Sequence, residues 1–144
     1  VTHRDPVVAQ ASVTNLLGTL YWMRSGKAFD AGAFESLMTP QSGAARLDGV
    51  IDLIESGGVP RAQIHNFRYV DMISDPLAAL RTLYRDVGLE LSDAALAGMH
   101  DYLAHKPQGK FGKHRYSVGE QEENARKRAL FRRYQEYFNC PDET

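Results

Sequence analysis

The dipeptide Asp5-Pro6 places a helix start almost at the beginning of the chain and constrains the fold more than any other feature. Aspartate caps the free N–H groups of a helix N-terminus, and proline suits the first helical position because its φ is fixed and no N–H is needed there. Apolar residues follow at helical spacing: Val8, Ala11, Leu16 and Leu20. Since Gly26 can end the helix, we expect it to run from about Pro6 to Arg24 with these residues facing inward.

Similar signals divide the rest of the chain into short elements. Hydrophobic spacing, prolines and glycines predict helices at 44–55, 76–87 and 92–104, a strand at 62–70, and a mixture of short helix and loop at 29–43. A capping box formed by Ser117 and Glu120 predicts a last helix. Its apolar residues are expected to be buried: Leu130, Phe131, Tyr134, Tyr137 and Phe138. The sequence therefore predicts a mainly helical chain with one or two strands.

Composition limits the classes of protein that need to be considered. With 144 residues and 43% hydrophobic content, residues 1–144 are sized for a single domain with a core. The net charge of −1 gives no reason to expect nucleic-acid binding, which needs a broad basic surface. No apolar stretch approaches 18 residues, and the lone Cys140 cannot form an internal disulfide. We expect no membrane span and a reducing, cytoplasmic location.

Arg4 and Ser12 flank the first helix start and together suit an anion. Ser12 lies roughly two turns into the helix, about 9 Å along its axis. A phosphate between the two residues would receive a charge-assisted fork from Arg4, a hydroxyl donor from Ser12 and a favourable helix dipole. The alternative is that Arg4 is solvated or ion-paired and Ser12 is an ordinary helix residue.

The arginine, the turn and the serine eight residues later resemble the 3′-phosphate-binding element of the sulfotransferases, which use 3′-phosphoadenosine 5′-phosphosulfate (PAPS). A second stretch, Tyr69-Val70-Asp71-Met72, looks like the family's strand ending of the type Tyr-Glu-Asp-Leu, with Val70 in place of the glutamate. The resemblance implies that Tyr69 lies near the adenine, which an aromatic ring with a hydroxyl suits. The alternative is that Tyr69 is a core strand residue.

A third stretch, 106–117, combines glycines with positive charge and resembles the family's late loop, which closes over the 3′-phosphate. The resemblance implies that Lys110, Gly112 and Lys113 contact this phosphate. Bacterial members often carry Gly-x-His-x-Tyr-Ser here, a pattern that residues 112–117 satisfy. The alternative is a basic surface loop.

The resemblance implies an α/β parent fold of the P-loop nucleoside-triphosphate-hydrolase type, of which this chain is the mainly helical second half. Members of the family have a glycine-rich strand-to-helix loop for the 5′-phosphosulfate, and no such loop precedes Arg4 in this sequence. The catalytic base of the family, usually histidine, also lies before the arginine and serine element. We therefore expect the C-terminal portion of a sulfotransferase domain, incomplete and inactive by itself, and assign no catalytic residue. His114 is not assigned as the base because it lies on the 3′-phosphate loop.

The implied function is transfer of a sulfuryl group from PAPS to an acceptor hydroxyl or amine, with this chain supplying the 3′-phosphate and adenine side. The acceptor is expected to be a small molecule of unknown class. A second hypothesis is a helical binding or assembly module without activity, derived from such an enzyme. A third is half of a nucleotide kinase, which would bind ATP more tightly than PAPS.

Other residue groups favour ordinary structural roles. No histidine has a Cys, Asp or Glu at a zinc-ligand spacing, so we expect no metal. The last helix carries a basic cluster that we expect to be a solvated face: Arg126, Lys127, Arg128, Arg132 and Arg133. Tyr21 and Trp22 are expected in the core, or else lining an acceptor pocket. Lys113, Ser117, Val118 and Glu122 loosely match a short dimer motif of some sulfotransferases, which implies a homodimer.

Overall fold

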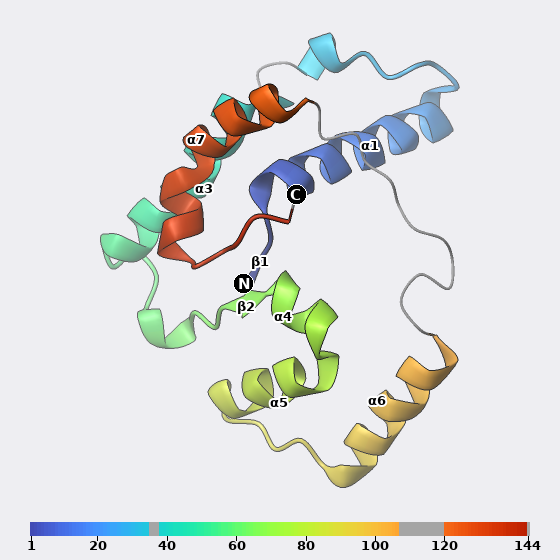
Figure 1. Cartoon of the computed structure of the whole chain (residues 1–144), viewed down its shortest axis with the longest axis vertical. Helices are drawn as coiled ribbons and strands as arrows, with labels where there is room; N and C mark the ends of the chain where they lie inside the picture. Colours follow the sequence, from blue (N-terminus) through green and yellow to red (C-terminus); the bar gives the residue numbers. More distant parts are fainter. Residues whose placement is uncertain (35–37, 107–119, 144) are drawn as a thin grey trace. The chain divides into compact units, whose positions relative to one another are not determined.

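The computed structural model describes residues 1–34, 38–106 and 120–143. Over these residues the chain packs as two compact units. The first unit contains residues 1–3 and 64–106. The second contains residues 4–34, 38–63 and 120–143 (Figure 1).

The first unit is built around a very short pair of parallel strands, β1 (Thr2–His3) and β2 (Phe67–Arg68). Thr2 is paired with Phe67 and His3 with Arg68. The expected strand over 62–70 is wrong in its extent, because residues 61–63 form a turn of 3₁₀-helix and Tyr69 opens a helix. The physical reason is the length of the partner: β1 ends at His3, since Asp5 and Pro6 already begin a helix.

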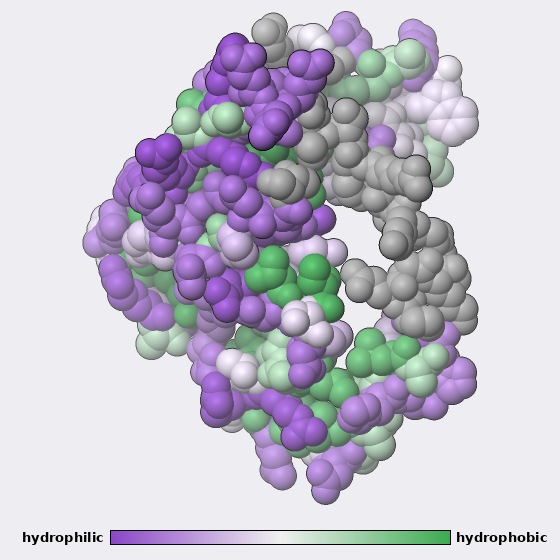
Figure 2. All heavy atoms as spheres, in the orientation of Figure 1, coloured by the Kyte–Doolittle hydropathy of each residue, from purple (hydrophilic) through white to green (hydrophobic). Residues whose placement is uncertain are grey.

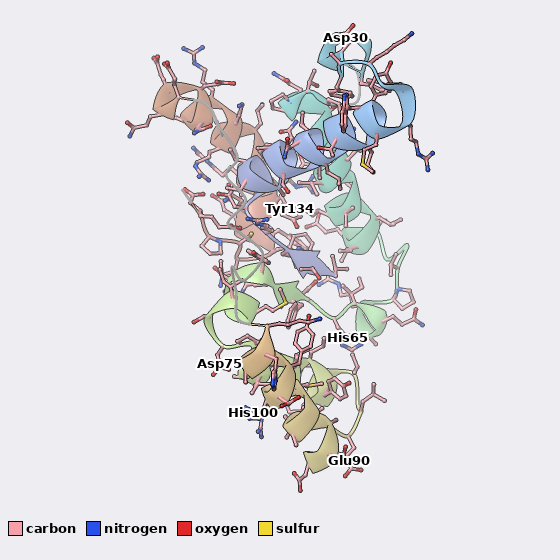
Figure 3. All side chains as sticks on the ribbon, turned by 90° about the vertical axis from the view of Figure 1, so that its right-hand side faces the viewer. Asp30, His65, Asp75, Glu90, His100 and Tyr134 are labelled. Atoms are coloured by element: carbon pink, nitrogen blue, oxygen red, sulfur yellow. The ribbon has the colours of Figure 1, made fainter. Side chains whose placement is uncertain are left out.

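Three helices complete the first unit: α4 (Tyr69–Ser74), α5 (Pro76–Asp86) and α6 (Asp93–His105). Asp75, labelled in Figure 3 between α4 and α5, accepts a hydrogen bond from the N–H of Ala78 at 3.0 Å. Ser92 caps α6 in the same way. The expected helices at 76–87 and 92–104 are thus confirmed to within one residue at each end, because their capping side chains act locally.

The second unit contains three long helices, α1 (Pro6–Ser25), α3 (Pro40–Glu55) and α7 (Gln121–Tyr137), with two 3₁₀ turns at Ala31–Phe34 and Arg61–Gln63. α3 and α7 lie side by side, and α1 contacts α7 (Figure 1). Phe131 of α7, only 1% exposed, packs with Val7 and Ala44. Gly43 lies against this ring, and a Cβ there would stand 3.4 Å from it, at van der Waals contact.

The ends of α1 agree with the prediction, whereas the start of α3 does not. α1 begins at Pro6 and is closed by Gly26 at a φ of +65°, as expected. α3 begins at Pro40, four residues earlier than expected, because Thr39 caps it by accepting the N–H of Ser42 at 3.1 Å. The expected capping box of α7 involves Ser117, which lies outside the described residues.

Burial along the helices is narrower than the apolar pattern suggests. Phe131 and Tyr134 of α7 and its C-cap Phe138 are buried, whereas Leu130 and Tyr137 are each 37% exposed. The buried positions are spaced by three and four residues and form one stripe, which the other two flank. Figure 2 shows hydrophilic side chains gathered over α7 on the face in view.

The outer part of α1 differs most from expectation. Leu16 and Leu20, expected to face inward, are 56% and 44% exposed. The buried residues of α1 are Pro6, Val7 and Val8, all in its first turn. Among the described residues, no helix combines the length and the apolar character that crossing a membrane requires.

Candidate anion-binding site at the start of helix α1

The turn from β1 to α1 brings Arg4 to the N-terminus of a long helix. β1 ends at His3, Arg4 follows, and Asp5 is the N-cap, accepting the N–H of Val7 at 2.9 Å. Pro6 is the first residue of the helix, where the backbone N–H that proline lacks would have no partner within the helix. The placement of Arg4 directly before a helix is therefore as expected from the sequence, and the structure adds a short strand before it.

The guanidinium of Arg4 forms a bidentate ion pair with the carboxylate of Glu143, and we call the donors that face this carboxylate the Arg4 fork. Its Nε donates to both oxygens of Glu143, at 3.0 and 3.1 Å, and its Nη2 donates to Oε2 at 3.0 Å. The backbone N–H of Asp5 adds a longer bond of 3.3 Å to Oε1. The structure therefore shows Arg4 ion-paired within the chain, which is the alternative stated for it above, and the Glu143 carboxylate occupies its fork.

Asp5 is fully buried and its charge is balanced by Arg128 of α7. Arg128 Nη1 lies 3.1 Å from Asp5 Oδ2 and also donates to Asp142, while the backbone N–H of Glu143 donates to Asp5 Oδ2 at 2.9 Å. These contacts correct the expectation of a uniformly solvated basic face. A buried carboxylate needs a paired cation, and Arg128 is the one that the fold brings to it.

A second member of the basic cluster is also tied to a neighbouring helix. Arg133 is paired with Asp52 at 2.7 Å and Glu55 at 3.1 Å, both on α3, and these carboxylates raise its pKa. Lys127 follows the expected local pattern and pairs with Glu123 at 2.7 Å, one turn earlier on α7, which lowers the pKa of that glutamate. The cluster therefore mixes solvated and structural cations.

Ser12 lies on α1 in the same unit as Arg4 and is partly exposed. The hydroxyls of Thr14, Thr19 and Ser25 on this helix each donate to the carbonyl four residues earlier. Within the described residues, Ser12 makes no such bond. Its hydroxyl is thus available to a ligand.

The other predicted site residues fall outside this unit or outside the described residues. Tyr69 belongs to the first unit, is half-buried and opens α4, so its expected position on a strand is wrong. Lys110, Gly112 and Lys113 lie outside the described residues, as does His114. Of the predicted site residues, the structure therefore describes Arg4, Ser12 and Tyr69.

Glu143 and His3 are absent from the predicted site, and Arg128 is predicted on a solvated face. His3 is 1% exposed, and its Nε2 is hydrogen-bonded to Asn66 Oδ1 at 2.9 Å. Burial lowers the pKa of this imidazole, although the bond to Asn66 acts in the opposite direction. His3 and Asn66 are far apart in the sequence and meet because β1 is paired with β2. Glu143 reaches Arg4 because the chain turns back towards the start of α1 after α7.

Tyr21 and Trp22 are not core residues. Trp22 is 60% exposed, whereas Tyr21 meets the rings of Phe29 and Phe34 edge-on, with centroids at 5.8 and 6.5 Å. These three rings line an apolar hollow of about 560 Å³ on the outer half of α1 together with Leu17 and Leu20. Across the described ranges, no group of three His, Cys, Asp or Glu side chains is placed to hold a metal ion.

The helical chain with its short parallel strand pair matches part of a sulfotransferase fold. The match is to the crystal structure of a sulfotransferase from Mycobacterium avium, with a TM-score of 0.63 and 23% sequence identity over 98% of this chain. The chain spans 36% of the length of that protein. Neither protein-family models nor curated protein sequences give a match to this chain.

Proposed function

We propose that this chain supplies the 3′-phosphate and adenine side of a PAPS site in a sulfotransferase. The observation that carries the proposal is the fork of Arg4, which lies between a strand and a helix N-terminus and is paired with the carboxylate of Glu143. The structural likeness to a mycobacterial sulfotransferase supports it. Arg4 and Ser12 would hold the 3′-phosphate through a charge-assisted fork and a hydroxyl.

The remaining roles in this proposal follow from the resemblance to the family. Tyr69 would meet the adenine, and the loop around Lys110, Gly112 and Lys113 would close over the phosphate. The reaction would be in-line transfer of the sulfuryl group to an acceptor hydroxyl or amine, in which fixed cations and N–H donors stabilise a charge-rich transition state. The residues of this chain would then bind and orient PAPS, and no catalytic base is assigned among them.

We further propose that the parent fold is of the P-loop type and that the 5′-phosphosulfate loop belongs to a part of the fold other than this chain. The support is the coverage, since the chain matches 36% of the sulfotransferase that it resembles. The acceptor would be a small molecule, and a cytoplasmic homodimer is the proposed state of the protein.

A second candidate function is a binding or assembly module derived from such an enzyme. The observation that favours it is an apolar face of α1, on which several large side chains are exposed: Val13, Leu16, Leu17, Leu20 and Met23. Apolar surface of this kind is typical of a protein interface. This module would retain bisphosphate affinity at Arg4 and would have no turnover.

The proposal is tested by calorimetric binding of adenosine 3′,5′-bisphosphate, with adenosine 5′-monophosphate as the ligand that lacks the 3′-phosphate. We expect Arg4→Gln to weaken bisphosphate binding by about 10- to 100-fold, because a bidentate charged contact is lost. Ser12→Ala should weaken it about fivefold, since one neutral hydrogen bond is lost. Neither change should affect the monophosphate.

Arg24→Gln is the matched control, because it removes the same charge from an exposed position at the opposite end of α1. We expect its bisphosphate affinity to stay within about twofold of the wild-type value. Equal binding of the two nucleotides by the wild-type protein would contradict the proposed PAPS site, and tighter binding of ATP would favour the nucleotide kinase.

A further inference from the structure

The last described residues of the chain are held against the start of α1 by a defined set of contacts. After α7, Asn139 adopts a φ of +48° and reverses the chain, and the N–H of Cys140 donates to the carbonyl of Gln135 at 2.8 Å. The Gln135 side chain donates to the carbonyl of Cys140 at 3.2 Å and to Asp142 at 2.8 Å. We call residues 139–143 the return segment. It places the Glu143 carboxylate at Arg4.

The donors that surround the Glu143 carboxylate form the set that a phosphate would use. Two nitrogens of the Arg4 guanidinium and the backbone N–H of Asp5 converge on its two oxygens at 3.0 to 3.3 Å. Carboxylate and phosphate accept the arginine fork with the same two-oxygen geometry. The side chain of Glu143 is 14% exposed and that of Arg4 is 28% exposed. A ligand could therefore reach the Arg4 fork only by displacing Glu143.

We propose that the return segment regulates the site: Glu143 competes with the 3′-phosphate for Arg4, so that the segment leaves the start of α1 when the nucleotide binds. This inference rests on the proposed function, because it takes the Arg4 fork as the 3′-phosphate position. It goes further by assigning an intramolecular competitor to that position.

The exchange leaves the helix start intact. When Glu143 leaves, Asp5 loses the N–H of Glu143 but keeps the N–H of Val7 and the guanidinium of Arg128. The incoming phosphate carries about −1.5 to −2 charges at pH 7, more than the carboxylate that it replaces. The greater charge of the phosphate favours its exchange with the carboxylate at Arg4.

The test measures adenosine 3′,5′-bisphosphate binding to the full-length protein and to its Glu143→Gln variant. If the return segment is closed in about nine molecules of ten, removing its charge should tighten binding by about tenfold. Glu136→Gln is the matched control, because it removes the same charge from an exposed position on α7 that is not in the Arg4 fork. The control should bind within about twofold of the wild-type protein.

A second measurement on the wild-type protein needs no substitution and therefore holds even if Glu143→Gln folds poorly. The N–H of Glu143 is bonded to Asp5, so hydrogen exchange detected by mass spectrometry should show protection in the peptide that contains the return segment. Saturation with the bisphosphate should remove this protection, and adenosine 5′-monophosphate should leave it in place.

Two results separate failure of this inference from failure of the proposed function. If Glu143→Gln binds like wild type, or the segment stays protected at saturation, while Arg4→Gln weakens binding, Glu143 is not a competitor and the phosphate site stands. If neither the wild-type protein nor Glu143→Gln binds the bisphosphate, both the proposed function and this inference are wrong.

Discussion

Asp5 is the side chain on which the start of α1 depends most. One carboxylate oxygen accepts the N–H of Val7, and the other accepts the N–H of Glu143 and the guanidinium of Arg128. The side chain of Asp5 is fully buried, whereas that of Arg128 is 18% exposed. A charge in this position is tolerated only because each oxygen has a donor and the ion pair is intact.

Removing the cation should therefore be costly. We expect Arg128→Met, which keeps most of the side-chain length, to lower the free energy of unfolding by about 2–4 kcal/mol, because it leaves a buried carboxylate without its counterion. Urea unfolding followed by circular dichroism measures the change. Arg126→Met is the matched control on the same helix, and its exposed ion pair with Glu122 should contribute at most about 0.5 kcal/mol. Equal losses in the two variants would contradict this account of Asp5.

At the scale of elements, α7 is the helix that joins the second unit. It packs along α3, contacts α1, and contributes Phe131 to the core with Val7 and Ala44. Ion pairs from Arg133 to Asp52 and Glu55 on α3 lie at the edge of this packing. Since the ion pairs are exposed to solvent, the buried aromatic ring is the main source of stability.

Truncation of this ring gives a quantitative test. Phe131→Ala should lower the free energy of unfolding by about 3–5 kcal/mol, because it removes buried apolar surface and leaves a cavity. Leu130→Ala, at the neighbouring 37% exposed position, should cost under about 1.5 kcal/mol. Chemical denaturation of both variants measures the difference. Comparable losses at the two positions would show that the core is not centred on Phe131.

The sequence predicted the starts of the helices better than it predicted the extent of the strands. The starts at Asp5, Asp75 and Ser92 are confirmed because a capping side chain bonds to N–H groups two or three residues away. The strand over 62–70 is wrong in extent because a strand exists only where a partner is paired with it, and β1 offers two residues.

At the scale of the whole molecule, the predicted site is distributed over the chain. Arg4 and Ser12 belong to one compact unit and Tyr69 to the other, while the loop residues lie outside the described ranges. The chain spans 36% of the sulfotransferase that it resembles. The proposed nucleotide affinity at Arg4 is therefore the property to measure first on this chain.

The stability of the whole chain should depend on pH through His3. Burial lowers the pKa of His3 below 6.5, so as the pH falls through about 6.5 the unfolded chain takes up a proton that the folded chain does not. Folding stability is therefore lost as the pH falls from about 6.5 towards the pKa of the folded state. Urea unfolding at pH 8 and pH 5.5 should show a larger loss for wild type than for His3→Gln.

His100→Gln is the matched control for this experiment, since it removes an exposed imidazole on α6 (Figure 3). We expect its loss of stability between the two pH values to equal that of the wild-type protein. An unchanged pH dependence in His3→Gln would show that the buried imidazole is not the group responsible.

By itself, the sequence determined the helix starts, the position of Arg4 directly before a helix, and the spacing of Ser12 from Arg4. These features depend on interactions between residues that are near neighbours in the chain. Tertiary structure alone decided which anion fills the Arg4 fork, which cation balances Asp5 and where His3 is buried. The partners in these contacts are separated by 139, 123 and 63 positions, and they meet only because packing of the helices and pairing of the strands bring distant segments together.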